Sequence, residues 1–180
     1  MVKTMSLRKL RSIDFAIIAE LIKNSRLSDR QLGKILHVSQ PTITRRRGQL
    51  EKEILLDYTA IPDLKELDFE ILAITFGNRA AYPAHAELQI QKAKDFIERH
   101  PNLIFVSSGR GFNSDRVVIS VHKNYTDYSK FQQQIKQEWE EIMAVEGSFI
   151  ISLTSDSILR HLTFKNLAEL IKKEHGQEKT

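Results

Sequence analysis

Hydroxyl, amide and guanidinium side chains follow one another between residues 39 and 49 of this chain. The segment reads Ser-Gln-Pro-Thr-Ile-Thr-Arg-Arg-Arg-Gly-Gln. Guanidinium and amide groups form bidentate hydrogen bonds with base edges in the major groove of DNA, and hydroxyl and guanidinium groups also bind phosphate oxygens. The segment therefore predicts DNA binding through Ser39, Gln40, Thr42, Thr44, Arg45, Arg46, Arg47 and Gln49.

A short amphipathic helix is expected just before this segment. Ser28 and Gln31 have the Ser-x-x-Gln spacing of a capping box, which satisfies free backbone N–H groups where a helix begins. Leu32, Ile35 and Leu36 then recur at helical spacing and give the helix an apolar face.

A second helix is expected to carry the polar segment itself. After a turn at residues 37–38, Ser39 is a suitable N-cap, and Pro41 lies in the first turn, where the missing N–H has no helical acceptor to lose. Residues 13–24 predict an earlier helix with a broad apolar face, for which Ser12 is the expected N-cap. Three helices in this order are typical of a helix-turn-helix domain.

The helical wheel separates the polar residues into two groups. At about 100° per residue, with Ile43 at zero, Arg47 lies near 40° on the core side, with its head reaching out toward phosphate, whereas Arg45 and Gln49 share the outer face. We therefore predict base contacts from Thr42, Arg45 and Gln49, and phosphate contacts from Gln40, Thr44, Arg46 and Arg47.

The charge of the chain is concentrated in the same region. Residues 1–62 contain 12 Lys and Arg against 6 Asp and Glu, whereas residues 63–180 contain 15 against 17. A basic module joined to a nearly neutral one is the electrostatic pattern expected of a nucleic-acid-binding domain with a partner domain. We predict a domain boundary after Pro62, which gives domains at 1–62 and 63–180.

Bulk composition excludes several classes of protein. No apolar run approaches the roughly 18 residues of a membrane helix, and the basic N-terminus lacks the apolar segment of a secretory signal. The absence of cysteine excludes disulfides and thiolate metal sites and fits a cytoplasmic protein. The six histidines show no metal-ligand spacing, so neither a metal nor another cofactor is expected.

The second half of the chain alternates between strand and helix patterns. A strand is expected at 54–61 as a wing or linker, ended by Pro62. The elements beyond it follow the order βαββαβ of a ferredoxin-like α+β sandwich. The expected strands are 69–76, 103–108, 116–122 and 148–154, and the expected helices are 84–100, 126–143 and a C-terminal 157–175.

Such a sheet has helices on one face only. Its other face carries apolar residues that a second copy would cover, which predicts a homodimer. The C-terminal helix is expected to cover part of the sheet or to reach across the dimer.

This order of elements resembles the Lrp/AsnC (feast/famine) family of bacterial and archaeal transcription regulators. The resemblance spans about Ile13 to Asp156 and rests on SIDFAIIAELIKN, LSDRQLGKILHVSQPTITRRR and LEKEILLDYTAIPD. It implies sequence-specific binding of double-stranded promoter DNA at pseudo-palindromic sites. It also implies a dimer through the C-terminal domains, in some members assembled into tetramers or octamers, and in some members an amino-acid effector.

The chain departs from the family pattern in two places. Arg47 stands where the family usually has an apolar residue, and Gly48 interrupts the recognition helix. The turn expected at 109–115 lacks the family's usual sequence near the effector site. Its candidate effector residues are Gly109, Arg110, Gly111 and Asp115, although a plain hairpin turn is the simpler interpretation.

Two other functions remain open. Clustered guanidinium groups also suit an architectural protein that coats DNA with little sequence preference. Proteins that decarboxylate haem precursors resemble this two-domain arrangement too, but the basic recognition helix argues against an enzyme, and we find no catalytic constellation.

Overall fold

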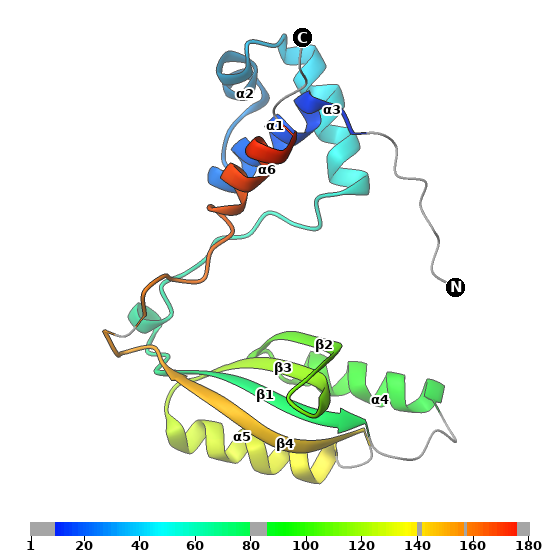
Figure 1. Ribbon diagram of the computed structural model, residues 1–180, viewed down its shortest axis with the longest axis vertical. Helices are drawn as coiled ribbons and strands as arrows, with labels where there is room; N and C mark the ends of the chain where they lie inside the picture. The colour runs from blue at the N-terminus through cyan, green and yellow to red at the C-terminus, as the bar shows by residue number, and fades with distance from the viewer. Residues whose placement is uncertain (1–9, 80–85, 140–141, 157, 176–180) are drawn as a thin grey trace. The chain divides into compact units, whose positions relative to one another are not determined.

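The computed structural model describes residues 10–79, 86–139, 142–156 and 158–175, and the side chains of these residues except 86–89. The described chain forms two compact units (Figure 1). The first contains residues 10–61 together with 161–175, and the second contains residues 62–160. We call them the helical unit and the sheet unit.

The helical unit is built on three helices that share an apolar core. Ile17, Leu32 and Ile43 have no exposed surface, one residue from each helix. The predicted helix-turn-helix arrangement is therefore confirmed. The helices are α1 (Ser12–Lys23), α2 (Asp29–Leu36) and α3 (Gln40–Glu53).

The N-cap of α1 is Arg11, one residue before the predicted Ser12. The backbone N–H of Arg11 donates to the carboxylate of Asp14 at 2.9 Å. A carboxylate in the first turn satisfies a free N–H and interacts favourably with the positive end of the helix.

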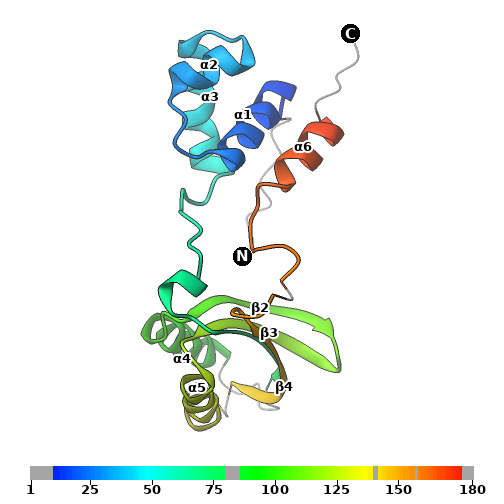
Figure 2. The ribbon, with the colours of Figure 1, turned by 90° about the vertical axis from the view of Figure 1, so that its left-hand side faces the viewer.

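A fourth helix, α6 (Leu167–His175), packs along α1 in this unit (Figure 2). Ala168 is fully buried, and the rings of Phe15 and His175 stack with centroids 3.9 Å apart. Lys172 pairs with Glu20 at 2.5 Å. The apolar and charged residues of α6 therefore complement α1.

This placement corrects two expectations for the C-terminal segment. The segment was predicted to belong to the second domain, 63–180, but residues 161–175 group with the helical unit. The helix is also shorter than 157–175, because it begins only at Leu167. Amphipathic spacing reveals an apolar face, but it does not say which surface that face will cover.

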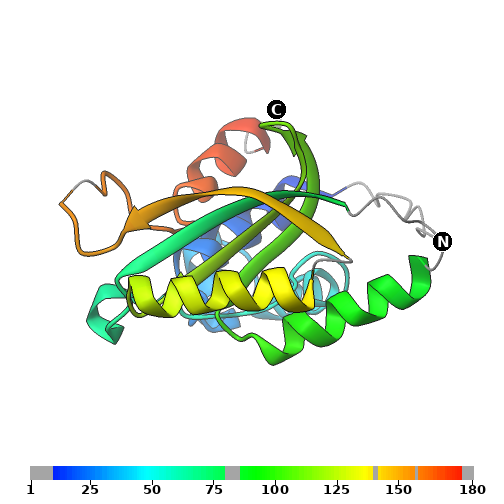
Figure 3. The same ribbon diagram turned by 90° about the horizontal axis from the view of Figure 1, so that it is seen from below.

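The sheet unit confirms the predicted βαββαβ order. Its four strands are antiparallel in the order β2-β3-β1-β4, the arrangement of a ferredoxin-like fold. Helices α4 and α5 lie on one face of the sheet (Figures 1 and 3). The elements are β1 (Ile71–Arg79), α4 (Ala86–Arg99), β2 (Leu103–Gly111), β3 (Ser114–His122), α5 (Tyr125–Glu138) and β4 (Met143–Ser152), preceded by a short 3-10 helix at Lys65–Leu67.

The other face of the sheet carries a row of apolar residues that crosses all four strands. Phe105 lies opposite Ile119, Ile119 opposite Ile74, and Ile74 opposite Phe149. Phe105 and Phe149 are 51% and 64% exposed. The predicted bare apolar face is therefore present in the sheet unit.

Two local predictions were wrong. Residues 54–61 form no strand in the structure, because a strand needs a hydrogen-bonded neighbour and no described segment pairs with this one. The turn expected at 109–115 is reduced to Phe112 and Asn113, both with positive φ, since β2 continues to Gly111 and β3 begins at Ser114. Residues 107–111 are small or polar, so they lack the apolar alternation that predicts a strand.

Candidate nucleic-acid interface

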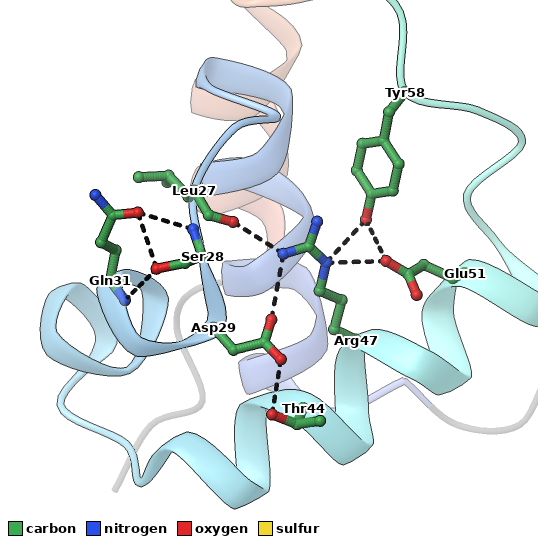
Figure 4. A network of polar contacts seen from close by, with 8 residues as sticks. All are labelled: Leu27, Ser28, Asp29, Gln31, Thr44, Arg47, Glu51 and Tyr58. Carbon is green, nitrogen blue, oxygen red and sulfur yellow. Dashed lines mark hydrogen bonds and ion pairs between the residues drawn. The ribbon is translucent and has the colours of Figure 1, made fainter.

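The helix that precedes the recognition helix begins with the predicted capping box. Ser28 Oγ accepts a hydrogen bond from the backbone N–H of Gln31 at 3.3 Å. The side chain of Gln31 accepts one from the backbone N–H of Ser28 at 2.8 Å (Figure 4). The start of α2 is thus determined by local sequence.

The turn between α2 and α3 is tight. His37 has the left-handed conformation (φ 55°) at the end of α2. A Cβ at Gly33 would lie 2.7 Å from the carbonyl oxygen of Val38, which is too close for any residue with a side chain. Glycine therefore lets the turn approach α2 and sets the angle at which α3 leaves it.

The outer face of α3 carries Arg45 and Gln49. Arg45 is exposed, and its side chain makes no hydrogen bond or ion pair within the part of the chain that the structure describes. A polar depression of about 260 Å³ lies beside these two residues, with Arg11 on the same wall. Its lining consists of Leu10, Arg11, Asp14, Arg45, Arg46, Gln49, Leu50 and Glu53.

The side chain of Arg46 points toward α1. Its Nη1 lies 3.2 and 3.4 Å from the two carboxylate oxygens of Asp14, and the two side chains are only 13% and 5% exposed. A paired, buried guanidinium is not available to a phosphate without losing this ion pair. Arg46 therefore joins α3 to α1.

Arg47 is the centre of a polar network in the helical unit (Figure 4). Its Nη1 donates to the carbonyl oxygen of Leu27 at 2.8 Å and to Asp29 at 3.2 Å. Its Nε donates to Glu51 at 2.9 Å and to the hydroxyl of Tyr58 at 3.1 Å. The side chain is 18% exposed, so its donors face the protein rather than the outer surface of α3.

These contacts change the acidity of the groups involved. Partial burial alone would lower the pKa of Arg47, but the hydrogen bonds that Arg47 donates to Tyr58, Glu51 and Asp29 outweigh it and raise that pKa. Burial raises the pKa of Tyr58, and the hydrogen bond from its hydroxyl to Glu51 raises it further. Tyr58 therefore stays protonated and donates to the carboxylate.

The four other polar residues, at the N-cap and in the first half of α3, differ in their environment. Thr44 is exposed, but its hydroxyl donates to Asp29 at 2.7 Å. Ser39 occupies the N-cap position, yet its hydroxyl contacts the hydroxyl of Thr42 at 2.9 Å instead of a backbone N–H. Gln40 is exposed at the start of the helix, where the positive end of the dipole favours anions.

The structure thus divides the eight candidate residues. Ser39, Gln40, Thr42, Arg45 and Gln49 lie on accessible parts of α3, whereas Thr44, Arg46 and Arg47 are held by carboxylates of the same unit. Asp14, Asp29 and Tyr58 are the partners that sequence reasoning missed. A carboxylate in the first turn of α1 and another in the first turn of α2 were the available signals, although their targets are 32 and 18 residues away.

The four candidate effector residues lie at the β2–β3 hairpin. Arg110 is exposed, and an added Cβ at Gly109 or Gly111 would meet no other atom within 4 Å. Asp115 is engaged, since it accepts the backbone N–H of Arg79 at 2.9 Å and lies 3.5 Å from Arg116. Both glycines belong to strand β2, so they lie outside the two-residue turn that joins β2 to β3.

In the described part of the chain, no group of three or more His, Asp or Glu residues is arranged to hold a metal ion. Among the described helices, none is long and apolar enough to cross a membrane.

Comparison with known proteins agrees with this geometry. Residues 12–51 match the AsnC-type helix-turn-helix domain. The chain is 38% identical over 98 residues to the HTH-type transcriptional regulator LrpC of Bacillus subtilis. The aligned segment covers 54% of this chain and 64% of LrpC. The chain is 31% identical over 90 residues to the uncharacterized regulator PH0061 of Pyrococcus horikoshii, which is 49% of this chain and 60% of that protein. The matched segments thus span less than two thirds of both relatives.

Solved structures extend the likeness to the sheet unit. The structure of B. subtilis LrpC superposes with a TM-score of 0.68 at 25% identity and covers 84% of this chain and 99% of LrpC. A complex of the Neisseria meningitidis regulator NMB0573 with L-Met has the same fold, with a TM-score of 0.68 at 16% identity over 88% of this chain and 99% of that one. With an AsnC-type helix-turn-helix joined to this sheet domain, the chain is similar to the transcription regulators of the Lrp/AsnC family.

Proposed function

We propose that this protein is a sequence-specific, DNA-binding transcription regulator that acts in the cytoplasm as a homodimer. The observation that carries the proposal is the outer face of α3, where Arg45 is exposed beside Gln49 and Thr42 and its side chain has no partner among the described residues. Arg and Gln recognise guanine and adenine edges in the major groove. The names of the relatives support the same role.

The contacts that we propose differ from the sequence expectation. Thr42, Arg45 and Gln49 read base edges, and Ser39 and Gln40 bind phosphate at the start of α3. Arg11 lines the same depression as Arg45 and adds a phosphate contact. Arg46, Arg47 and Thr44 position the helix, since each is held by a carboxylate of the same unit.

The test is selection of bound fragments from genomic DNA by the full chain at physiological salt. We expect a pseudo-palindrome whose half-sites lie about one helical turn apart or a multiple of it. Uniform recovery with a steep salt dependence would support an architectural protein instead. Recovery of no DNA would contradict both and favour the enzyme alternative, which haem-like absorbance of the purified protein would reveal.

The dimer that we propose forms through the apolar row on the open face of the sheet. Phe105 and Phe149 are large apolar residues that are half or more exposed. The same face of a second copy would bury them. Phe149→Lys should lower the oligomeric state measured by light scattering, whereas Tyr125→Lys, at an exposed residue where α5 begins, should not. An unchanged mass for Phe149→Lys would contradict this interface. The same experiment shows whether the wild type forms tetramers or octamers.

We also propose that Arg110 binds the carboxylate of an amino-acid effector. Arg110 is exposed near the end of β2, and the Neisseria meningitidis regulator of the same fold is in a complex with L-Met. Calorimetric titration with the amino acids, methionine first, should detect binding that Arg110→Ala weakens. Absence of binding to the wild type, or binding that Arg110→Ala leaves unchanged, would contradict this role.

A further inference from the structure

The segment that follows the recognition helix is held by a single polar cluster. Tyr58 lies five residues beyond the end of α3, and its hydroxyl donates to Glu51 Oε1 at 2.9 Å while accepting a hydrogen bond from Arg47 Nε at 3.1 Å. The guanidinium of Arg47 also lies over the Tyr58 ring, 5.1 Å from its centroid. We call Arg47, Glu51 and Tyr58 the latch (Figure 4).

The latch has firm support inside the helical unit. Besides Glu51 and Tyr58, Arg47 binds the carbonyl oxygen of Leu27 and the carboxylate of Asp29. Leu27 and Asp29 belong to the loop between α1 and α2 and to the first turn of α2. One guanidinium therefore fixes the hydroxyl of Tyr58 relative to both helices of the helix-turn-helix.

The residues on either side of Tyr58 have little other support. Leu56 is fully exposed and Ile61 is 48% exposed. No described strand pairs with residues 54–61. Leu55 is the exception, since it packs against the helical core at the start of the segment. Beyond Leu55, the path of the connecting segment therefore depends on Tyr58.

We propose that the latch is a positioning device that sets the spacing between the two DNA half-sites recognised by the dimer. This inference rests on the proposed function. The connecting segment leads from the recognition helix to the sheet unit, through which the dimer is proposed to form. Fixing the direction in which that segment leaves α3 restricts the separation of the two recognition helices, and half-site spacing follows this separation.

The test compares Tyr58→Phe with wild type in the full chain. Phe keeps the ring over Arg47 and removes only the hydroxyl, so the fold is retained. Duplexes carry the selected half-site twice, with the spacer varied in steps of one base pair, and binding to a single half-site is measured separately. We expect unchanged affinity for the single half-site, and about a fivefold smaller preference for the best spacer over its neighbours, since one hydrogen bond is lost.

Two further variants make the result specific. Arg47→Lys keeps the positive charge but cannot hold four acceptors at once, so it should weaken the spacer preference in the same way. Tyr125→Phe removes a hydroxyl from an exposed tyrosine of the sheet unit and should leave the preference unchanged. Thermal unfolding of each variant shows whether the fold itself has changed.

The outcomes are distinct. An unchanged spacer preference in Tyr58→Phe would overturn the inference. An equal loss of affinity for the single half-site and for every spacer would also overturn it, because such a loss indicates a general defect of the helical unit. If the wild type selects no half-site, the proposed function itself is contradicted. If Tyr58→Phe loses spacer preference but keeps its affinity for the single half-site, the latch is supported.

Discussion

Buried polar groups in the helical unit carry charge, whereas those in the sheet unit are neutral. The helical unit buries Asp14 against Arg46 and places the guanidinium of Arg47 among four acceptors. In the sheet unit, Thr75 contacts the hydroxyl of Ser148 at 2.8 Å, and Ser120 contacts His122 Nε2 at 2.8 Å.

This difference teaches how one helix can carry three consecutive arginines and direct them differently. A buried guanidinium is stable only with a carboxylate partner, so Asp14 and Asp29 turn Arg46 and Arg47 inward and leave Arg45 exposed on the outer face of the helix. In the sheet unit, Thr75 and Ser120 are buried and are satisfied by hydrogen bonds to neutral side chains. The two units should therefore respond differently to loss of charge, to packing changes and to pH.

The largest effect is expected from breaking the buried ion pair. Asp14→Ala leaves Arg46 without its carboxylate partner and removes the hydrogen bond from the backbone N–H of the N-cap residue Arg11, so the helical unit should lose about 3 kcal/mol or more. Hydrogen exchange of peptides covering α1 and α3 measures this loss. The fluorescence of Trp139, the single tryptophan, should report little change in the sheet unit.

Two controls sharpen this prediction. Glu98→Ala removes an exposed carboxylate from α4 and should change stability by less than about 0.5 kcal/mol. The double variant Asp14→Leu with Arg46→Met removes both charges and should be more stable than Asp14→Ala alone. Equal exchange rates in α1 for wild type and Asp14→Ala would show that the ion pair has no structural role.

The contact between α6 and α1 should give the next largest effect. Ala168 is fully buried there, so Ala168→Leu overfills the contact and should destabilise the helical unit by about 1–3 kcal/mol. Exchange in α1 and α6 measures the change, with Leu170→Ala, at a residue 48% exposed, as the control. Full tolerance of leucine at position 168 would mean that α6 does not belong to this unit.

Replacement of Gly48 should have a smaller effect, which raises the stability of the helix but lowers its affinity for DNA. An added Cβ meets nothing within 4 Å, so Gly48→Ala should stabilise α3 by about 0.5–1 kcal/mol. Because Gly48 is on the outer side of the helix, the same methyl group should hinder close approach of the DNA backbone and lower affinity. A variant that is more stable and binds DNA as well as wild type would contradict this role for glycine.

The sheet unit should show the smallest effect, confined to mildly acidic conditions. Burial lowers the pKa of His122 below its ordinary value of about 6.5, although Asp127 raises it in part. The unfolded chain therefore takes up the proton first, so the stability contributed by neutral His122 is complete above about pH 6.5 and declines as the pH falls toward the folded-state pKa.

His122→Gln retains a neutral hydrogen-bonding group next to Ser120 and should remove this part of the pH dependence. Urea unfolding followed by Trp139 fluorescence, repeated between about pH 7.5 and 5, measures it. The same slope for variant and wild type would assign the acid sensitivity to other groups.

The fold was largely predictable because its signals are local. The capping box at Ser28 and Gln31 and the alternating strands require only neighbours in sequence. The placement of α6 and the absence of a strand at 54–61 were not predictable, since both depend on which distant surface an element meets.

The candidate interface shows the same limit at the level of single residues. The helical wheel correctly placed Arg45 and Gln49 outward and Arg47 toward the core. It could not predict that Arg47 binds Asp29 and Tyr58, or that Arg46 binds Asp14, because those partners come from other segments. Long side chains choose among several acceptors, and sequence spacing does not determine the choice.

The most direct test of the central claim is the base preference of Arg45→Ala. Once wild type has selected a half-site, each of its base pairs is replaced in turn and the affinity of both proteins is measured by competition. We predict that Arg45→Ala loses about 1–3 kcal/mol of discrimination at one base pair and keeps the wild-type preference at the others. A uniform loss of affinity at every position, or no loss at all, would contradict the claim that Arg45 alone of the three arginines reads a base.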